Sequence, residues 1–189
     1  SRYRRWMADR KREFVTTPKG DFIPNPIMGT VEGEILSESD LETLAPGTWL
    51  IDSVMQAIIK SIAHEDVLNP SVGFMPILFY EKLTTPFDFL DDVGTYEFER
   101  VAKWFKKKFR GKKVSNMSTL IIFKNMNHDH WLTYGIFLDK KIIQEFNSLG
   151  HSSIQSLQHL YHWLHDHMEL EGKHLKPKEW CLFPPQART

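Results

Sequence analysis

This chain has a single cysteine, no long apolar run and no net charge. Cys181 is the only thiol among its 189 residues, which excludes an internal disulfide and favours a reducing, intracellular compartment, the nucleus or cytoplasm. No apolar run approaches the roughly 20 residues that a membrane-spanning helix needs, and no signal peptide opens the chain. Because 24 basic residues balance 24 acidic ones, no overall field draws the protein to nucleic acid or to a membrane.

The first 30 residues differ from the rest. Residues 1–17 carry six basic side chains with aromatic ones between them, a pattern that fits a helix packed on the domain or an arm that binds phosphate. Residues 18–30 contain prolines and glycines that favour an extended connection. We therefore predict an arm and linker over residues 1–30 and one monomeric domain over residues 31–189. Ser1 in place of an initiator methionine indicates a processed or excised piece.

Hydrophobic periodicity after residue 30 predicts both helices and strands. Ser39 and Glu42 form a capping-box pattern at the start of a brief helix. Asp52 is the expected N-cap of a second helix, whose wide apolar stripe predicts burial in the core. Helices are predicted over residues 52–62, 96–109 and 154–168, strands over 31–36, 119–123 and 180–183, and a helical or irregular segment over 72–80.

The central stretch predicts a β-hairpin. Apolar, β-branched and aromatic runs on either side meet at Asp139, Lys140 and Lys141, a short polar connection of the kind that joins antiparallel strands. His130 opens the first strand and Asn147 closes the second, so antiparallel pairing brings an imidazole and an amide to the same end of the sheet. An amide oxygen placed there can hold a histidine ring for acid–base chemistry.

Two further patterns leave alternatives open. The helix over residues 154–168 carries four histidines, His159, His162, His165 and His167, whose spacing could bind zinc, but they alternate with core positions and no cysteine or carboxylate set completes a site. We expect no metal and no other cofactor. The lysine-rich segment from Lys103 to Lys113 is either a solvated helix face or a docking surface for an acidic protein or nucleic acid, with nucleic acid the less favoured partner.

The motifs, taken in order, resemble the catalytic domain of the SUMO-specific (sentrin-specific) cysteine proteases, which process ubiquitin-like proteins. The resemblance covers roughly residues 36–186. It implies an α+β fold of papain-like cysteine protease architecture, with a mixed central sheet flanked by helices. The motifs are Ser39 to Leu44, Trp49-Leu50-Ile51-Asp52, Trp104-Phe105-Lys106-Lys107, His130-Trp131, Phe146 to Gly150 and the Trp180 strand.

The resemblance also implies roles for single residues. His130 matches the catalytic histidine, and His128 lies two positions too early. Asn147 stands where the family has an aspartate, so it can orient the ring but adds no negative charge. Gln186 resembles the glutamine that donates to the oxyanion. Trp49, Asp52 and Trp131 match the substrate-binding segments, the two tryptophans as walls of a narrow channel for a Gly-Gly tail.

The nucleophile is the main departure. The family's Asp-Cys-Gly does not follow Gln186, because the sequence ends at Thr189, and Cys181 lies upstream of the required position, where we predict a buried core residue. Three hypotheses follow. The chain is a fragment of a cysteine peptidase or isopeptidase acting on SUMO or another ubiquitin-like protein with a Gly-Gly C-terminus, an inactive relative that only binds such a protein, or an unrelated α/β module with a basic docking face.

Overall fold

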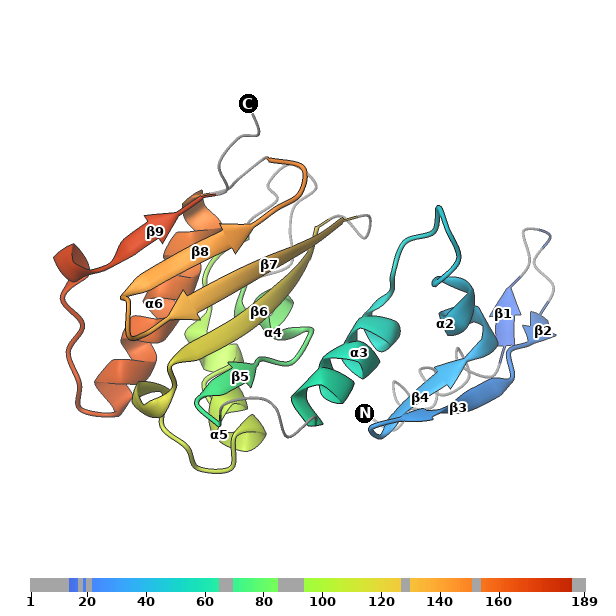
Figure 1. The fold of residues 1–189 in the computed structure, drawn as a ribbon, viewed down its shortest axis with the longest axis horizontal. Helices are drawn as coiled ribbons and strands as arrows, with labels where there is room; N and C mark the ends of the chain where they lie inside the picture. The colour runs from blue at the N-terminus through green and yellow to red at the C-terminus, as the bar shows by residue number, and fades with distance from the viewer. Residues whose placement is uncertain are drawn as a thin grey trace. The chain divides into compact units, whose positions relative to one another are not determined.

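The computed structural model describes residues 14–16, 19, 22–64, 70–84, 94–126, 130–150 and 154–184. The chain divides into two compact units, Ser1–Asp66 and Val67–Thr189, each described by itself below (Figure 1). The helix or arm predicted over residues 1–17 lies outside the described residues except for residues 14–16. The division into an arm over 1–30 and a domain over 31–189 stays a prediction.

The first unit contains two antiparallel hairpins. Strand β1 (Phe14–Thr16) pairs with β2 (Phe22–Pro24), and β3 (Ile27–Val31) pairs with β4 (Glu34–Ser37). Glu32 and Gly33 form the turn of the second hairpin with φ angles of 47° and 77°, the left-handed conformation that two-residue hairpin turns require. The single strand predicted over residues 31–36 is therefore wrong: the chain reverses at Gly33. The extended connection predicted over residues 18–30 is likewise wrong where it forms β2 and β3.

Two helices follow these hairpins in the chain. The N-cap of helix α2 (Glu38–Glu42) is Ser37, two residues before the predicted N-cap, because the capping box is formed by Ser37 and Asp40 rather than by Ser39 and Glu42. The Asp40 carboxylate accepts from the Ser37 N–H at 2.7 Å and from the Ser53 hydroxyl at 2.8 Å, which ties α2 to α3.

Helix α3 (Asp52–His64) confirms the predicted helix, with Asp52 as its first residue rather than its N-cap. Val54 and Ala57 are buried against Leu36 of β4. Ile58 and Ile62 are 41% and 42% exposed, so only part of the apolar stripe lies in the core, contrary to prediction. The described part of this unit, two hairpins and two helices, is too small to cover a stripe that wide on all sides.

The second unit is built on a five-stranded mixed sheet in the order β5-β6-β7-β8-β9 (Figure 1). The central strands β6, β7 and β8 run antiparallel to one another, whereas β5 is parallel to β6 and β9 is parallel to β8. The strands are β5 (Val72–Phe74), β6 (Thr119–Met126), β7 (His130–Phe137), β8 (Ile142–Phe146) and β9 (Cys181–Phe183). The predicted strands over residues 119–123 and 180–183 and the central hairpin are confirmed.

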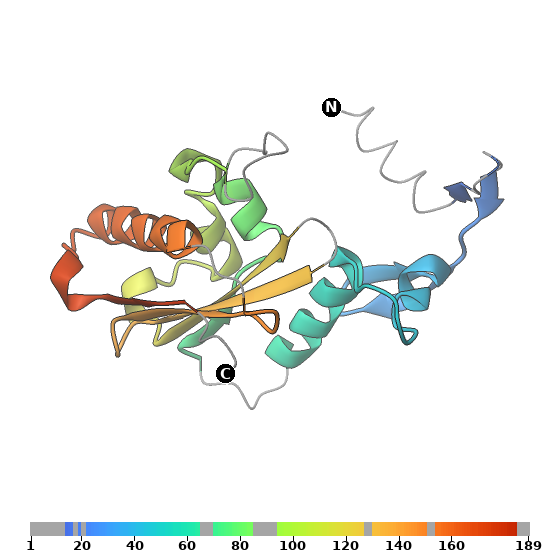
Figure 2. The same cartoon turned by 90° about the horizontal axis from the view of Figure 1, so that it is seen from above.

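Helices pack on one face of this sheet, as Figure 2 shows. They are α4 (Phe79–Leu83), α5 (Trp104–Lys108) and α6 (Ile154–Leu170). The 3-10 turns η1 (Phe98–Arg100) and η2 (Val114–Asn116) lie between these helices in the chain, and η3 (Pro177–Glu179) follows α6. Leu157, Leu160 and Leu164 of α6 are fully buried, which confirms the predicted helix and most of its apolar face.

Two predicted elements need correction. The helix expected over residues 96–109 is the turn η1 followed by the short helix α5. The break between them lets both Val101 and Phe105 reach the core. Residues 72–80, predicted as helical or irregular, form strand β5 and the start of α4. Gly73 sits so close to the ring of Phe109 that a Cβ there would lie 2.7 Å from it, a close approach that glycine permits.

Candidate active site

His130 and Asn147 meet at one end of the sheet because of strand register. His130 begins β7 opposite Met126 of β6, and Asn147 directly follows Phe146, the last residue of β8. Phe146 is paired with Thr133, so Asn147 lies one residue farther toward His130. The two side chains are hydrogen-bonded, with 2.8 Å between His130 Nε2 and Asn147 Oδ1.

A second hydrogen bond fixes the direction of the first. Asn147 Oδ1 also accepts from the backbone N–H of Leu149 at 2.9 Å. Because only the amide oxygen can accept from a backbone N–H, this oxygen must be the atom that faces His130. The imidazole therefore donates through Nε2–H, and in the neutral ring Nδ1 carries the lone pair. The arrangement holds a histidine base in one tautomer, with Nδ1 ready to take a proton.

Polar side chains also lie deeper on the same face of the sheet. We call this group the buried polar cluster, and its members come from α4, all three central strands and α6. Each is at most 7% exposed. The cluster consists of Tyr80, Lys124, Tyr134, Glu145, Ser156 and His159.

The contacts within the cluster run from strand to helix. Lys124 Nζ donates to Ser156 Oγ at 3.4 Å and lies 5.1 Å from the centre of the Tyr80 ring. The Tyr80 ring stacks on Tyr134, with 5.7 Å between centroids. The Tyr80 hydroxyl lies 3.4 Å from Nδ1 of His159. Buried charges and hydroxyls are costly unless they are paired or hydrogen-bonded, so this layer is held together by polar contacts as well as by packing.

Burial raises the pKa of both phenols in the cluster far above the ordinary value for tyrosine. The negative charge of Glu145 adds to the rise in the pKa of Tyr80 and of Tyr134. Both hydroxyls therefore keep their protons at any physiological pH. The sequence analysis missed this cluster although its signal was present: alternation places Lys124 after Leu120 and Ile122, on the buried side of β6.

The other predicted site residues are distributed as follows. Trp131 is half-buried on β7, paired with Asn125 of β6, and alternation turns it to the face opposite His130. Trp49, 62% exposed, and Asp52, the first residue of α3, belong to the first unit. His128 and Gln186 lie outside the described residues.

Cys181 is exposed, so the prediction that it is a buried core residue is wrong. It begins the edge strand β9, where alternation turns Leu182 toward the core and leaves Cys181 on the other face. Its partner Ile142 is five residues before Asn147, roughly 16 Å along the strand at about 3.3 Å per residue. Cys181 and His130 thus lie at opposite ends of the sheet and on opposite faces.

Of the four histidines of α6, His159 and His167 are buried. His167 is buried between the rings of Phe98, Phe105 and Trp163, with centroid distances of 5.2, 6.0 and 4.8 Å. Burial lowers the pKa of His167, although the carboxylates of Glu171 and Asp166 oppose this shift. Across the described ranges, no group of three or more histidine, cysteine or carboxylate side chains is placed to hold a metal ion. No helix in those ranges is long and apolar enough to cross a membrane.

Comparison with known proteins places this geometry in context. The model of a protein family, described as the Ulp1 protease family, C-terminal catalytic domain, matches residues 48–180. No curated protein matches the chain significantly.

Several solved structures resemble the fold. The C-terminal Ulp1 protease domain in complex with Smt3, the yeast ortholog of SUMO, has 22% identity and a TM-score of 0.67 over 88% of this chain and 70% of that one. The SUMO protease Ulp1 with its catalytic cysteine oxidised to a sulfonic acid has 21% identity and a TM-score of 0.64 over 87% and 69%. The Ulp1-like SUMO protease catalytic domain of Chaetomium thermophilum has 16% identity and a TM-score of 0.57 over 97% and 68%. These likenesses confirm the predicted α+β fold of papain-like cysteine protease architecture.

Proposed function

Because the chain belongs to the Ulp1 protease family, as its C-terminal catalytic domain, we propose that it supplies the acid–base half of a cysteine peptidase or isopeptidase. Its substrate in this proposal is SUMO or another ubiquitin-like protein with a Gly-Gly C-terminus. A similar protease domain has been solved in complex with a SUMO ortholog, which supports that substrate class.

The observation that carries the proposal is the hydrogen bond of 2.8 Å between His130 and Asn147. Asn147 acts as the orienting group, itself held by the N–H of Leu149. His130 would take the proton of a cysteine thiol at Nδ1 and later return it to the leaving amine. Since Asn147 is neutral, the imidazolium formed in between receives no charge stabilisation from its partner, unlike a histidine paired with aspartate.

The position of Cys181 supports the further proposal that these 189 residues lack the nucleophile. A base activates a thiol only within hydrogen-bond reach, about 2.6–3.2 Å or through one water, whereas Cys181 sits at the other end and face of the sheet. We accordingly propose that the chain by itself does not cleave its substrate.

The neutral Asn147 and the remote position of Cys181 also favour a second candidate function. A relative that retains the substrate channel but only binds a ubiquitin-like protein would tolerate both a neutral residue at Asn147 and a cysteine remote from His130. The two candidates differ in what the whole gene encodes. An Asp-Cys-Gly sequence shortly after Thr189, together with hydrolysis of a fluorogenic SUMO substrate by the whole gene product, supports the peptidase.

The test of the lost nucleophile uses a thiol-reactive probe built on the C-terminus of SUMO. We expect no labelling of the 189-residue chain that depends on His130, because Cys181 has no base beside it. Labelling of the Cys181→Ser variant gives the background. Stoichiometric labelling of Cys181 that His130→Ala abolishes would overturn our reading of this thiol.

Binding tests the substrate class. If Trp131 lines the channel for the Gly-Gly tail, calorimetry with unmodified SUMO should give an affinity in the micromolar range or tighter. Trp131→Ala should weaken it by about 2 kcal/mol, roughly thirtyfold, as for a buried aromatic anchor. Cys181→Ser is the control that should bind like the parent. Equal affinity of the parent and Trp131→Ala for every ubiquitin-like protein tested would remove the channel from the proposal.

A further inference from the structure

The end of the sheet remote from His130 carries a concentrated positive charge, although the chain as a whole is neutral. Seven basic residues and no acidic one lie from Lys103 to Lys113, and all seven side chains are exposed on α5 and the loop after it. Lys140, Lys141, Lys173 and Lys176 add to this end from the β7–β8 turn and the segment after α6. The sequence alone left this charge as a solvated face or a docking surface.

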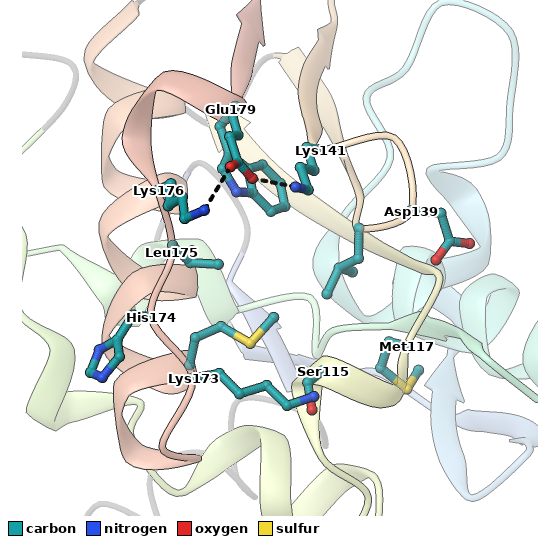
Figure 3. A pocket seen from close by; sticks show the side chains of 12 residues that line it. Ser115, Met117, Asp139, Lys141, Lys173, His174, Leu175, Lys176 and Glu179 are labelled. Atoms are coloured by element: carbon teal, nitrogen blue, oxygen red, sulfur yellow. Dashed lines mark hydrogen bonds and ion pairs between the residues drawn. The ribbon is translucent and has the colours of Figure 1, made fainter.

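A pocket opens in the middle of this charged end (Figure 3). Its volume is about 270 Å³, and its walls come from η2, the β7–β8 turn, the end of α6 and the segment leading into η3. The apolar part of the lining consists of Met117, Leu138, Met168, Leu175 and Trp180. Pockets for drug-sized ligands span roughly 300–1,000 Å³, so this one has the size for a single large side chain.

Two polar groups in the pocket have unused hydrogen-bonding capacity. Within the part of the chain that the structure describes, the buried hydroxyl of Ser115 has no hydrogen-bond partner. Its position is fixed because Glu171 accepts from the backbone N–H groups of Val114 and Ser115 at 2.6 and 3.2 Å. Lys173 reaches toward Ser115 across one side of the pocket (Figure 3), and none of the ion pairs between described residues involves it.

The remaining charges at the rim show which anions fit. Glu179 is bound by Lys141 and Lys176, and Asp139 points away from the pocket (Figure 3). Two carboxylates in or beside the wall disfavour a continuous phosphate backbone, and Trp180 is the one aromatic side chain in the apolar part of the lining, too little surface for stacking successive bases. A carboxylate next to an apolar side chain suits both the lysine with its neighbouring hydroxyl and the apolar lining.

We propose that this end of the molecule is a docking site for an acidic peptide segment of a partner protein. One apolar side chain of that segment enters the pocket, an adjacent carboxylate is bound by Lys173 and Ser115, and further acidic residues lie along the basic surface from Lys103 to Lys113. The site is separate from the His130–Asn147 pair and does not depend on the proposed peptidase function.

The test is fluorescence anisotropy of a labelled peptide with one leucine between four acidic residues, titrated with the 189-residue chain. We expect saturable binding that weakens with added salt. Replacing the leucine by serine should weaken binding at least about tenfold, because the pocket is then unfilled. Equal binding of both peptides would overturn the proposal.

Variants separate the pocket from general attraction to positive charge. Lys173→Gln should weaken peptide binding at least about tenfold and Ser115→Ala about threefold, whereas Lys82→Gln, an exposed lysine on α4, should bind like the parent. Circular dichroism confirms the fold of each variant. Equal affinities for Lys173→Gln and Lys82→Gln would exclude the site. If an oligothymidine of the same charge binds more tightly than the peptide, the proposed peptide-docking site is wrong and the surface binds nucleic acid instead.

Discussion

The two ends of the five-stranded sheet use polar side chains in opposite ways. At one end, two hydrogen bonds of 2.8 and 2.9 Å fix the geometry of His130 and Asn147. At the other end, exposed lysines surround a pocket, and the ion pairs there are open to water. Acid–base chemistry needs one geometry and one tautomer, whereas docking needs a field that tolerates small displacements. The fold places directional hydrogen bonds where chemistry is proposed and exposed positive charge where binding is proposed.

The largest effect is expected from a core substitution in helix α6, which supports both ends of the sheet. Trp163 is fully buried against Phe79 and His167, with centroid distances of 5.1 and 4.8 Å. Trp163→Ala should lower the free energy of unfolding by about 3–5 kcal/mol, measured by urea denaturation. It should weaken peptide docking and the His130–Asn147 contact together. Leu170→Ala, at a residue of the same helix that is 70% exposed, should change stability by less than about 0.5 kcal/mol. Similar losses in the two variants would contradict this packing.

A smaller effect is expected from adding charge to the neutral end. Asn147→Asp puts a carboxylate beside the His130 ring, which stabilises its protonated form. The pH midpoint for protonation of His130, followed by NMR of the ring, should rise by about one to three pH units.

The control for this substitution lies at the opposite end of the sheet. Lys173→Gln should leave the His130 midpoint unchanged, because water and salt screen an exposed charge at that distance. An Asn147→Asp variant with an unshifted midpoint would show that the amide does not face the ring in solution.

The smallest effect concerns the stability of the protein in acid, to which the buried His167 should contribute and the exposed His174 should not. Burial lowers the pKa of His167 in the folded protein, so below about pH 6.5 the unfolded chain binds a proton that the folded one does not. The free energy of unfolding should therefore fall as the pH drops from 6.5 toward the lowered pKa, and should not change above pH 6.5 on account of this residue.

His167→Phe should remove this part of the acid destabilisation. Denaturation at about pH 7.5 and about pH 5.5 gives the loss of unfolding free energy on acidification for the parent and for the variant. The difference between these two losses is the contribution of His167. His174→Phe is the matched control, because His174 is exposed and outside the core. A variant that loses as much stability on acidification as the parent would contradict the role of His167.

The sequence by itself determined the central hairpin and the meeting of His130 with Asn147. Alternating runs on both sides of the short turn at Asp139 to Lys141 fix the register locally, and that register brings the two residues to one end of the sheet. The buried strand over residues 119–123 and the helix over residues 154–168 also follow from periodicity within consecutive residues, as does the family resemblance carried by His130-Trp131.

Tertiary structure alone decided the features that depend on partners distant in the sequence. Cys181 is exposed because β9 is an edge strand that presents alternate residues to α6, and no local pattern shows which strand becomes an edge. Lys124 and Glu145 share a buried layer only because β6 and β8 flank β7. The pocket around Ser115 and Lys173 is formed by four segments that the chain brings together from residues 115 to 180. Patterns in consecutive residues specify which side of an element is apolar, whereas what packs against that side is set by contacts between elements far apart in the chain.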